Sequence, residues 1–155
     1  MIYTIMIVTM VALDRWSKMW AQDVLTKVDT LPLLQNVFHL TYVENRGAAF
    51  SILHGKVGFL ILFTGIVLMF LFAMLISSIK KRESKILIMA LTMVIGGAIG
   101  NMYDRIVLGY VVDYFDFRLI NFAVFNVADV FVVCGSILLG IYLIFFEGKE
   151  KAIVR

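Results

Sequence analysis

One aspartate borders a long uncharged run in the segment DVFVVCGSILLGIYLIFF, residues 129–146. Counted from residue 122, the segment is 25 residues long and Asp129 is its only charge. Because about 20 apolar residues cross the hydrocarbon core of a bilayer, the pattern predicts a transmembrane helix over 122–146. A carboxylate beside hydrocarbon costs about 2.5–3.5 kcal/mol at the centre of a spanning helix and less near its end. Asp129 is therefore a candidate functional residue.

The whole chain has the composition of an integral membrane protein. Of its 155 residues 62% are hydrophobic, and the mean hydropathy is +0.97, whereas soluble domains are about 45–50% apolar. Further spans are predicted at 57–79 and 86–105, and residues 2–21 form a fourth if Asp14, Arg15 and Lys18 lie in its last turns. Because the chain has a single proline and very few low-complexity stretches, we expect no linker between domains. We expect an all-α membrane protein with four transmembrane helices in one domain, 1–155.

Charge bias predicts the orientation of these spans. The connection Lys80–Lys85 carries four basic residues against one acid, and the tail from Glu147 carries three against two. Basic connections stay in the cytoplasm, so both termini are expected to be cytoplasmic. Polar side chains then gather at the outer membrane boundary: Asp14, Lys18, Asn101, Asp104, Arg105, Asp113, Asn126 and Asp129. The net charge of +3 thus indicates membrane orientation and not nucleic-acid binding. Residues 1–13 lack a basic leader and are expected to be a retained anchor.

The outer connection between the first two spans, residues 22–56, has a strand pattern. Apolar and polar positions alternate over residues 38–43, and Asn45-Arg46-Gly47 supplies turn-forming residues. We expect a small extracytoplasmic β-hairpin or sheet that lies on the membrane surface, where aromatic side chains are favoured.

Glycines and polar residues share the third predicted span. Gly96 and Gly100 have the small-xxx-small spacing that lets another helix approach closely. Gly97, Asn101 and Arg105 lie four apart, so they form one stripe that can bind a peptide carbonyl or orient a carboxylate. The alternative is that Arg105 and the preceding aspartate only anchor the helix end in lipid headgroups.

Asp14 and Lys18 are also four apart and are expected to form an ion pair on one helix face. The pair is either part of a site or a simple means of ending the first span at the membrane interface. Cys134, in contrast, lies within an apolar run and is expected to be a packing residue that can form no internal disulfide.

Two aspartates near the fourth span make the strongest catalytic proposal. Asn126 is expected to be its N-cap and Asp129 to favour the positive end of the helix. Helix capping does not explain Asp113. This aspartate follows two valines, in a segment short enough to fold back to the start of the same helix. Two carboxylates held close together retain one proton, so one can activate water while the other donates to a carbonyl oxygen. Asp116 is expected to be solvated.

The other usual catalytic groups are less suitable. Cys134 lies too deep in its apolar run, and His39 and His54 lack a metal-ligand spacing. No serine lies in a recognisable nucleophile elbow. The aspartate pair is therefore the strongest catalytic candidate.

Five blocks of the chain resemble prolipoprotein signal peptidases, the signal peptidase II family. They are Asp14-Arg-Trp-Ser-Lys18, Asn45-Arg-Gly-Ala-Ala-Phe50, Gly96-Gly-Ala-Ile-Gly-Asn-Met-Tyr-Asp-Arg105, Val111-Val-Asp113 and Phe125-Asn-Val-Ala-Asp129. The resemblance implies a membrane aspartic endopeptidase with Asp113 and Asp129 as its catalytic pair and Asp104 in a supporting role. It also implies that further residues line or brace the site: Asp14, Lys18, Asn45, Gly47, Gly97, Asn101, Arg105, Asn126 and Ala128.

The same resemblance implies the reaction and its setting. An aspartate-activated water attacks the peptide bond before a diacylglyceryl-modified cysteine of a bacterial prolipoprotein, and no metal or organic cofactor is needed. The substrate reaches the site from the lipid, and the enzyme works as a monomer in the bacterial plasma membrane, with its active site on the extracytoplasmic side and without nucleic acid.

Two other classes of function remain open from the residues alone. A small carrier or proton-coupled channel would use a relay of the charged residues Asp14, Lys18, Asp104, Arg105 and Asp129. A non-catalytic assembly subunit would use Gly96 and Gly100 as a docking surface. A carrier would favour charges distributed through the depth of the bilayer, but the span at 57–79 has no charged residue and the polar groups cluster at one side, which favours the peptidase.

Overall fold

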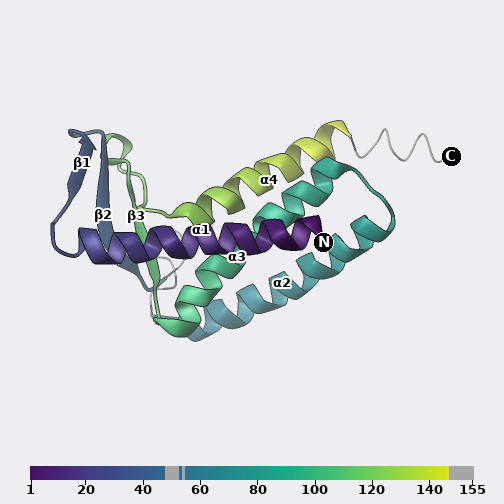
Figure 1. Ribbon diagram of the computed structural model, residues 1–155, viewed down its shortest axis with the longest axis horizontal. Coiled ribbons are helices and arrows are strands. Elements are labelled where there is room, and N and C mark those ends of the chain that lie inside the picture. Colours follow the sequence, from purple (N-terminus) through teal and green to yellow (C-terminus); the bar gives the residue numbers. More distant parts are fainter. Residues whose placement is uncertain (48–52, 54, 147–155) are drawn as a thin grey trace.

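The computed structural model describes residues 1–47, 53 and 55–146. These residues form four α-helices and a small sheet (Figure 1). In chain order the elements are α1 (Ile2–Leu25), β1 (Leu31–Leu34), β2 (Phe38–Asn45), α2 (Val57–Lys80), α3 (Lys85–Val107), β3 (Val111–Asp116), the 3-10 helix η2 (Arg118–Ile120) and α4 (Val127–Phe145). Of the sequence-based predictions, those on His54, on the end of the second block at 48–50 and on the tail from 147 lie outside the described residues.

Three of the described helices, α2, α3 and α4, are long and apolar enough to cross a membrane. The spans predicted at 57–79 and 86–105 are confirmed to within two residues. The first helix is not among the three, because Asp14, Arg15, Lys18 and Asp23 interrupt its apolar sequence. Its exposed face is nevertheless apolar: Ile5, Val8 and Trp16 are each at least 60% exposed, whereas Asp14 and Lys18 are fully buried.

Helix α1 is longer than predicted, since it continues to Leu25 and does not end near residue 21. Ala21 and Leu25 are buried in a cluster with Leu40, Val112 and Tyr114 of the sheet. The last turns of α1 are therefore stabilised by packing against strands that come later in the chain. The helix thus continues seven residues beyond Lys18.

Helix α4 begins at Val127, five residues later than predicted. The backbone of Phe125 pairs with β3, donating to the Phe115 oxygen at 3.1 Å and accepting from Tyr114 and Phe115 at 3.0 and 2.8 Å. Asn126 then caps the helix, as predicted. Its side chain accepts from the Asp129 backbone and the Asp129 side chain accepts in return, which forms a capping box.

The sheet is antiparallel in the order β1-β2-β3. The hairpin expected between the first two spans is confirmed as β1 and β2. The third strand was not predicted, and it comes from the connection between α3 and α4. Since Val43 pairs with Asp113 in the register of β2 and β3, the sheet determines where this aspartate lies.

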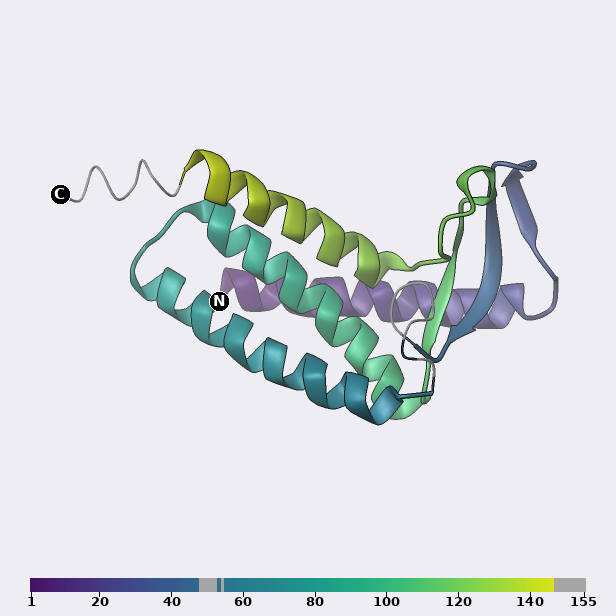
Figure 2. The same ribbon diagram turned by 180° about the vertical axis from the view of Figure 1, so that it is seen from behind.

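Glycines of α3 allow close approach of two neighbouring helices. A Cβ added at Gly96 would lie 2.9 Å from the Met10 sulfur, and one at Gly100 would lie 2.6 Å from Asp14, both on α1. At Gly97 it would collide with the Ala128 carbonyl of α4. The packing role predicted for Gly96 and Gly100 is confirmed, and Gly97 is a third close contact. Figures 1 and 2 show the sheet at one end of the bundle, with the N-terminus and the α2–α3 connection at the other.

Candidate active site

Asp113 and Asp129 meet at the junction of β3 and α4. Asp113 is 2% exposed and Asp129, in the first turn of α4, is half-buried. Asn126 bridges them: its Nδ2 donates to Asp113 Oδ1 at 2.6 Å, and its backbone N–H donates to Asp129 Oδ2 at 3.1 Å. The predicted return of Asp113 to the start of the last helix is confirmed, and one residue positions both carboxylates.

Neutral amides supply the other hydrogen bonds of this carboxylate pair. Asn45 Nδ2 donates to Asp113 Oδ2 at 2.9 Å, and Asn101 Nδ2 donates to Asp129 Oδ1 at 2.7 Å. Asn126 Nδ2 also donates to Asn101 Oδ1 at 3.0 Å, which joins the two amides. Within residues 1–47, 53 and 55–146, no lysine or arginine forms an ion pair with either aspartate.

The protonation of Asp113 follows from these surroundings. Burial and the negative charge of Asp129 raise the pKa of Asp113 from 3.8 to about 7, although hydrogen bonds from Asn45 and Asn126 oppose the shift. Two interacting carboxyls lose their protons as a pair. The pair can therefore hold one proton near neutral pH, which is the state that acid–base catalysis by two carboxyls requires.

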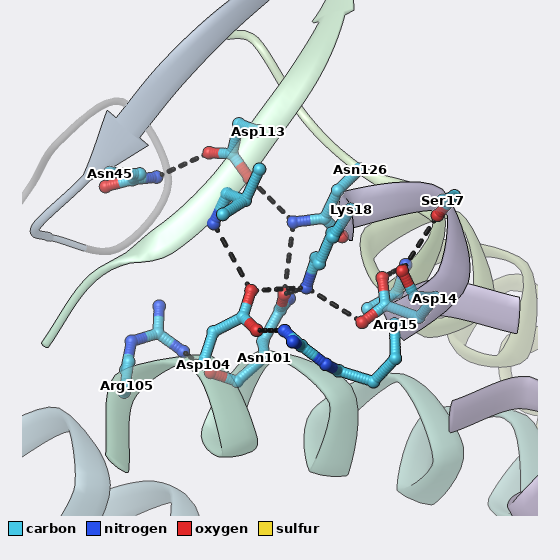
Figure 3. A network of polar contacts seen from close by, with 12 residues as sticks. Asp14, Arg15, Ser17, Lys18, Asn45, Asn101, Asp104, Arg105, Asp113 and Asn126 are labelled. Carbon is cyan, nitrogen blue, oxygen red and sulfur yellow. Dashed lines mark hydrogen bonds and ion pairs between the residues drawn. The ribbon is translucent and has the colours of Figure 1, made fainter. Parts of the chain in front are cut away.

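A second acidic pair, Asp14 and Asp104, is neutralised by cations (Figure 3). Lys18 Nζ is 2.8 Å from Asp14 Oδ2 and 2.9 Å from Asp104 Oδ2, and all three side chains are fully buried. Arg15 is the second cation of this cluster, with its Nη1 at 2.5 Å from Asp104 Oδ1. The predicted Asp14–Lys18 pair is confirmed, whereas the alternative that Asp104 anchors the helix end in headgroups is wrong.

This buried ion cluster also holds the backbone beside the first pair. Asp14 Oδ1 accepts from the N–H of Ala128 at 2.9 Å, and Asp104 Oδ2 accepts from the N–H of Val112 at 3.2 Å. These residues immediately precede Asp129 and Asp113. Lys18 Nζ also donates to Asn101 Oδ1 at 2.9 Å. That contact assigns the oxygen of this amide, so its nitrogen faces Asp129.

The stripe on α3 has both of the predicted roles, because one residue orients a carboxylate and another binds a peptide carbonyl. Asn101 orients the Asp129 carboxylate, while Arg105 Nη2 donates to the Gly47 carbonyl at 3.1 Å. The Gly47 N–H in turn donates to Asn45 Oδ1 at 2.9 Å. Arg105 thus fixes the chain beside Asn45, and Gly97 supports the site only through helix packing.

A cavity of about 440 Å³ opens onto the carboxylate pair. Its polar lining comes from Asp113, Asp129, Asn45, Asn101 and Arg105. Its apolar lining comes from Val111, residues 122–125 and the α4 side chains Val130, Val132, Val133 and Cys134. Cys134 is exposed on α4 and is not packed inside, so that expectation is wrong. A site that is polar at the carboxylates and apolar elsewhere suits a ligand with both a peptide backbone and hydrocarbon.

Some contacts could not be found from the sequence. Arg15 and Asp104 are 89 residues apart, and the bond from the Tyr114 hydroxyl to Ser17 Oγ, at 2.7 Å, spans 97 residues. Asp116 was expected to be solvated, but it accepts from Thr41 Oγ1 at 2.8 Å and from Arg118 Nε at 2.9 Å. The unpredicted β2–β3 pairing causes this error. No group of three or more His, Cys, Asp or Glu suited to a metal occurs among the residues described.

The fold and the site together define a multi-pass membrane protein with paired carboxylates in a cavity at one end of its helical bundle. A family model described as signal peptidase (SPase) II, Peptidase_A8, matches residues 6–145. The chain therefore belongs to the signal peptidase II family, as its sequence blocks predict.

Individual relatives agree with the family match. The chain is 44% identical over 154 residues to the lipoprotein signal peptidase of Clostridioides difficile (strain 630), with 97% of this chain and 100% of the relative covered. It is 46% identical to that of Caldanaerobacter subterraneus subsp. tengcongensis over 93% of this chain and 96% of the relative. A bacterial membrane enzyme solved by the in meso method at 2.3 Å resolution superposes with a TM-score of 0.79 at 29% identity, covering 92% of this chain and 87% of that one.

Proposed function

We propose that this chain cleaves diacylglyceryl-modified prolipoproteins before the lipidated cysteine, with Asp113 and Asp129 as the catalytic residues. Membership of the signal peptidase II family makes the chain a peptidase that removes signal peptides from prolipoproteins. The observation that carries the assignment of the aspartates is their bridging by Asn126, at 2.6 Å to one and 3.1 Å to the other, in the wall of one cavity.

The reaction needs one ionised and one protonated carboxyl. The ionised aspartate takes a proton from a water molecule, which attacks the scissile carbonyl carbon. The protonated aspartate donates its proton to the carbonyl oxygen as negative charge develops there. When the tetrahedral intermediate collapses, the C–N bond breaks, the leaving amine takes the proton that the first aspartate removed from water, and the second aspartate regains a proton from a hydroxyl of the intermediate. Asn45, Asn101 and Asn126 hold the carboxylates in place, and the chemistry calls for no metal or organic cofactor.

The cavity lining supports a substrate that is partly lipid. Its polar end would receive the backbone near the cleaved bond, and its apolar wall, including Val130 and Val133, would contact hydrocarbon. A substrate anchored in the bilayer has already lost much of its translational freedom, so alignment of the peptide bond costs less than it would in solution.

We also propose the orientation of the chain. Four helices cross the bacterial plasma membrane, both termini are cytoplasmic, and the carboxylate pair lies on the extracytoplasmic side. The basic connection between α2 and α3 lies at the opposite end of the bundle from the sheet (Figure 1), which agrees with a cytoplasmic location. Helix α1 crosses because Asp14, Arg15 and Lys18 face α3 and α4 while lipid meets its apolar side. One domain, residues 1–155, works as a monomer with membrane lipid around it.

The proposed function is tested with purified protein and a synthetic lipopeptide in the presence of a chelator and without nucleotide. We expect cleavage on the amino side of the lipidated cysteine, identified by mass spectrometry of both products. The matched control is the same peptide with an unmodified cysteine, which should be cleaved far more slowly because it lacks the bilayer anchor. Cleavage that requires added metal, or at another bond, would contradict the proposal.

A further inference from the structure

The segment between β3 and α4 exposes large apolar side chains outside the spanning helices. Leu119 and Ile120, in η2, are 69% and 68% exposed, and Phe122 is 48% exposed. We call these three residues the η2 patch. Between Asp116 and Asp129 the sequence has a single charged residue, Arg118.

The one charge of this segment is turned away from the patch. Arg118 Nε donates to Asp116 Oδ2 at 2.9 Å, and its Nη2 donates to the hydroxyls of Thr30 and Thr41 at 3.2 and 3.3 Å. The guanidinium is therefore held on the sheet by three partners. Asn121 then takes a left-handed conformation, with φ of 52°, that ends η2. The result is an apolar outward surface on a well-anchored turn.

The position of the patch indicates what it meets. The Leu119 N–H donates to the Val37 oxygen at 3.4 Å, so η2 lies beside the β1–β2 turn. Figures 1 and 2 both show the connection from β3 lying beside the ends of β1 and β2 before it leads into the first turn of α4. Phe122 belongs to the patch and also lines the cavity, together with the exposed α4 residues Val130 and Val133. The patch is thus continuous with the apolar face of a spanning helix.

We propose that the η2 patch inserts into the bilayer leaflet that surrounds the first turn of α4, with Phe122 at the edge of the cavity. We infer that lipid contacts the patch for two reasons. The apolar surface continues through Phe122 to the membrane-facing side of α4, and the charged side chain of Arg118 points away from the patch. Inserted there, the patch holds the sheet against the membrane and leaves the cavity open to substrate that arrives within the leaflet. The inference rests on the membrane placement of the chain and not on the catalytic role of the aspartates.

Spin labels test the insertion directly. Cys134 is the only cysteine, so a Cys134→Ser background allows single labels at Leu119→Cys and Ile120→Cys. The variants are reconstituted in vesicles of phosphatidylethanolamine and phosphatidylglycerol, and collisions with oxygen and with a water-soluble nickel complex are measured by EPR. We expect oxygen to dominate at both positions, as it should at Ile137→Cys on the lipid-facing side of α4. A label at Glu44→Cys, exposed on the sheet, should favour nickel.

The remaining outcomes would overturn the proposal. Nickel access at residues 119 and 120 equal to that at residue 44 would place the patch in water. Protection from both reagents would show that a protein surface, such as a second copy of the chain, covers it. Because these readouts do not depend on peptide cleavage, an inactive but correctly inserted protein would refute the proposed reaction and leave the insertion intact.

Discussion

Two pairs of aspartates lie in one hydrogen-bonded network, and different groups contact the two pairs. Asp14 and Asp104 contact Lys18 at 2.8 and 2.9 Å. Asp113 and Asp129 are held instead by asparagine amides, at distances of 2.6 to 2.9 Å. A cation beside a carboxylate stabilises its ionised form, whereas an amide leaves much of the cost of burial in place.

The comparison separates a structural use of aspartate from the chemical use that we propose for Asp113 and Asp129. The cation-paired aspartates accept the backbone N–H groups of Ala128 and Val112, each one residue before a member of the other pair. They act as fixed supports. The amide-held aspartates share a cavity wall and keep a proton within reach, because burial and mutual repulsion raise the pKa of Asp113.

The largest expected effect comes from the amide-held pair. Asp113→Asn or Asp129→Asn should each lower kcat on a lipopeptide by about 10³-fold or more. An amide can neither accept nor donate the proton that the replaced carboxyl transfers. Thermal midpoints should be retained, since asparagine keeps the shape of the side chain. Asp116→Asn is the matched control: its carboxylate lies on the same strand but contacts Thr41 and Arg118. Near-normal turnover by either site variant would contradict the assignment.

Substitution of a cation-paired aspartate should lower stability more than it lowers kcat. Asp104→Asn leaves Lys18 and Arg15 short of a buried counter-charge, and removal of one partner from a buried ion pair typically costs about 3–5 kcal/mol. We expect a large fall in the thermal midpoint, with activity lost mainly through unfolding. The control Glu44→Gln breaks an exposed pair with Arg46 and should cost less than about 1 kcal/mol. Full stability with abolished cleavage would show that Asp104 belongs with the catalytic pair.

Asn101 connects the two pairs and should have an intermediate effect. It accepts from Lys18 and donates to Asp129. Asn101→Ala should lower kcat by about 10–100-fold, in the range found for residues that orient a reactive group, while KM changes little. A rise in KM with unchanged kcat would indicate that Asn101 binds substrate and does not orient Asp129.

The smallest effect concerns the helix contact that supports both pairs. In Gly97→Ala the new methyl group would meet the Ala128 carbonyl and Val132, so α3 and α4 must move apart at a cost of about 1–3 kcal/mol. Gly140→Ala is the control, because a Cβ there meets nothing within 4 Å. Equal thermal midpoints for the two variants would show that close packing at Gly97 does not position Ala128.

Much of this architecture follows from local patterns in the sequence. Uncharged runs gave α2 and α3 to within two residues, and the three-residue spacing of Asn126 and Asp129 predicted the cap of α4. The spacing of Asp14 and Lys18 predicted their ion pair, because residues four apart share a helix face. These features depend on neighbours along the chain or on one helix.

The errors arose where tertiary contacts override a local pattern. Residues 122–125 are apolar enough to continue a spanning helix, but the backbone of Phe125 pairs with β3. The end of α1 packs on strands, so polar residues did not end it at residue 21. Contacts such as Arg15 with Asp104 join segments 89 residues apart, and no spacing rule reaches that far.

The pH dependence of kcat/KM on a lipopeptide tests the shared proton most directly. Since the pKa of Asp113 is raised from 3.8 to about 7, the carboxyl should be protonated below about pH 7 and lose its proton above it. Its proton is bound more tightly in the folded protein, so folding stability should decrease as pH rises from about 4 to 7. The account predicts that kcat/KM falls on the alkaline side of an apparent pKa near 7 and again in acid, where the pair becomes fully protonated. Activity that stays constant through the alkaline range while the protein remains folded would contradict it.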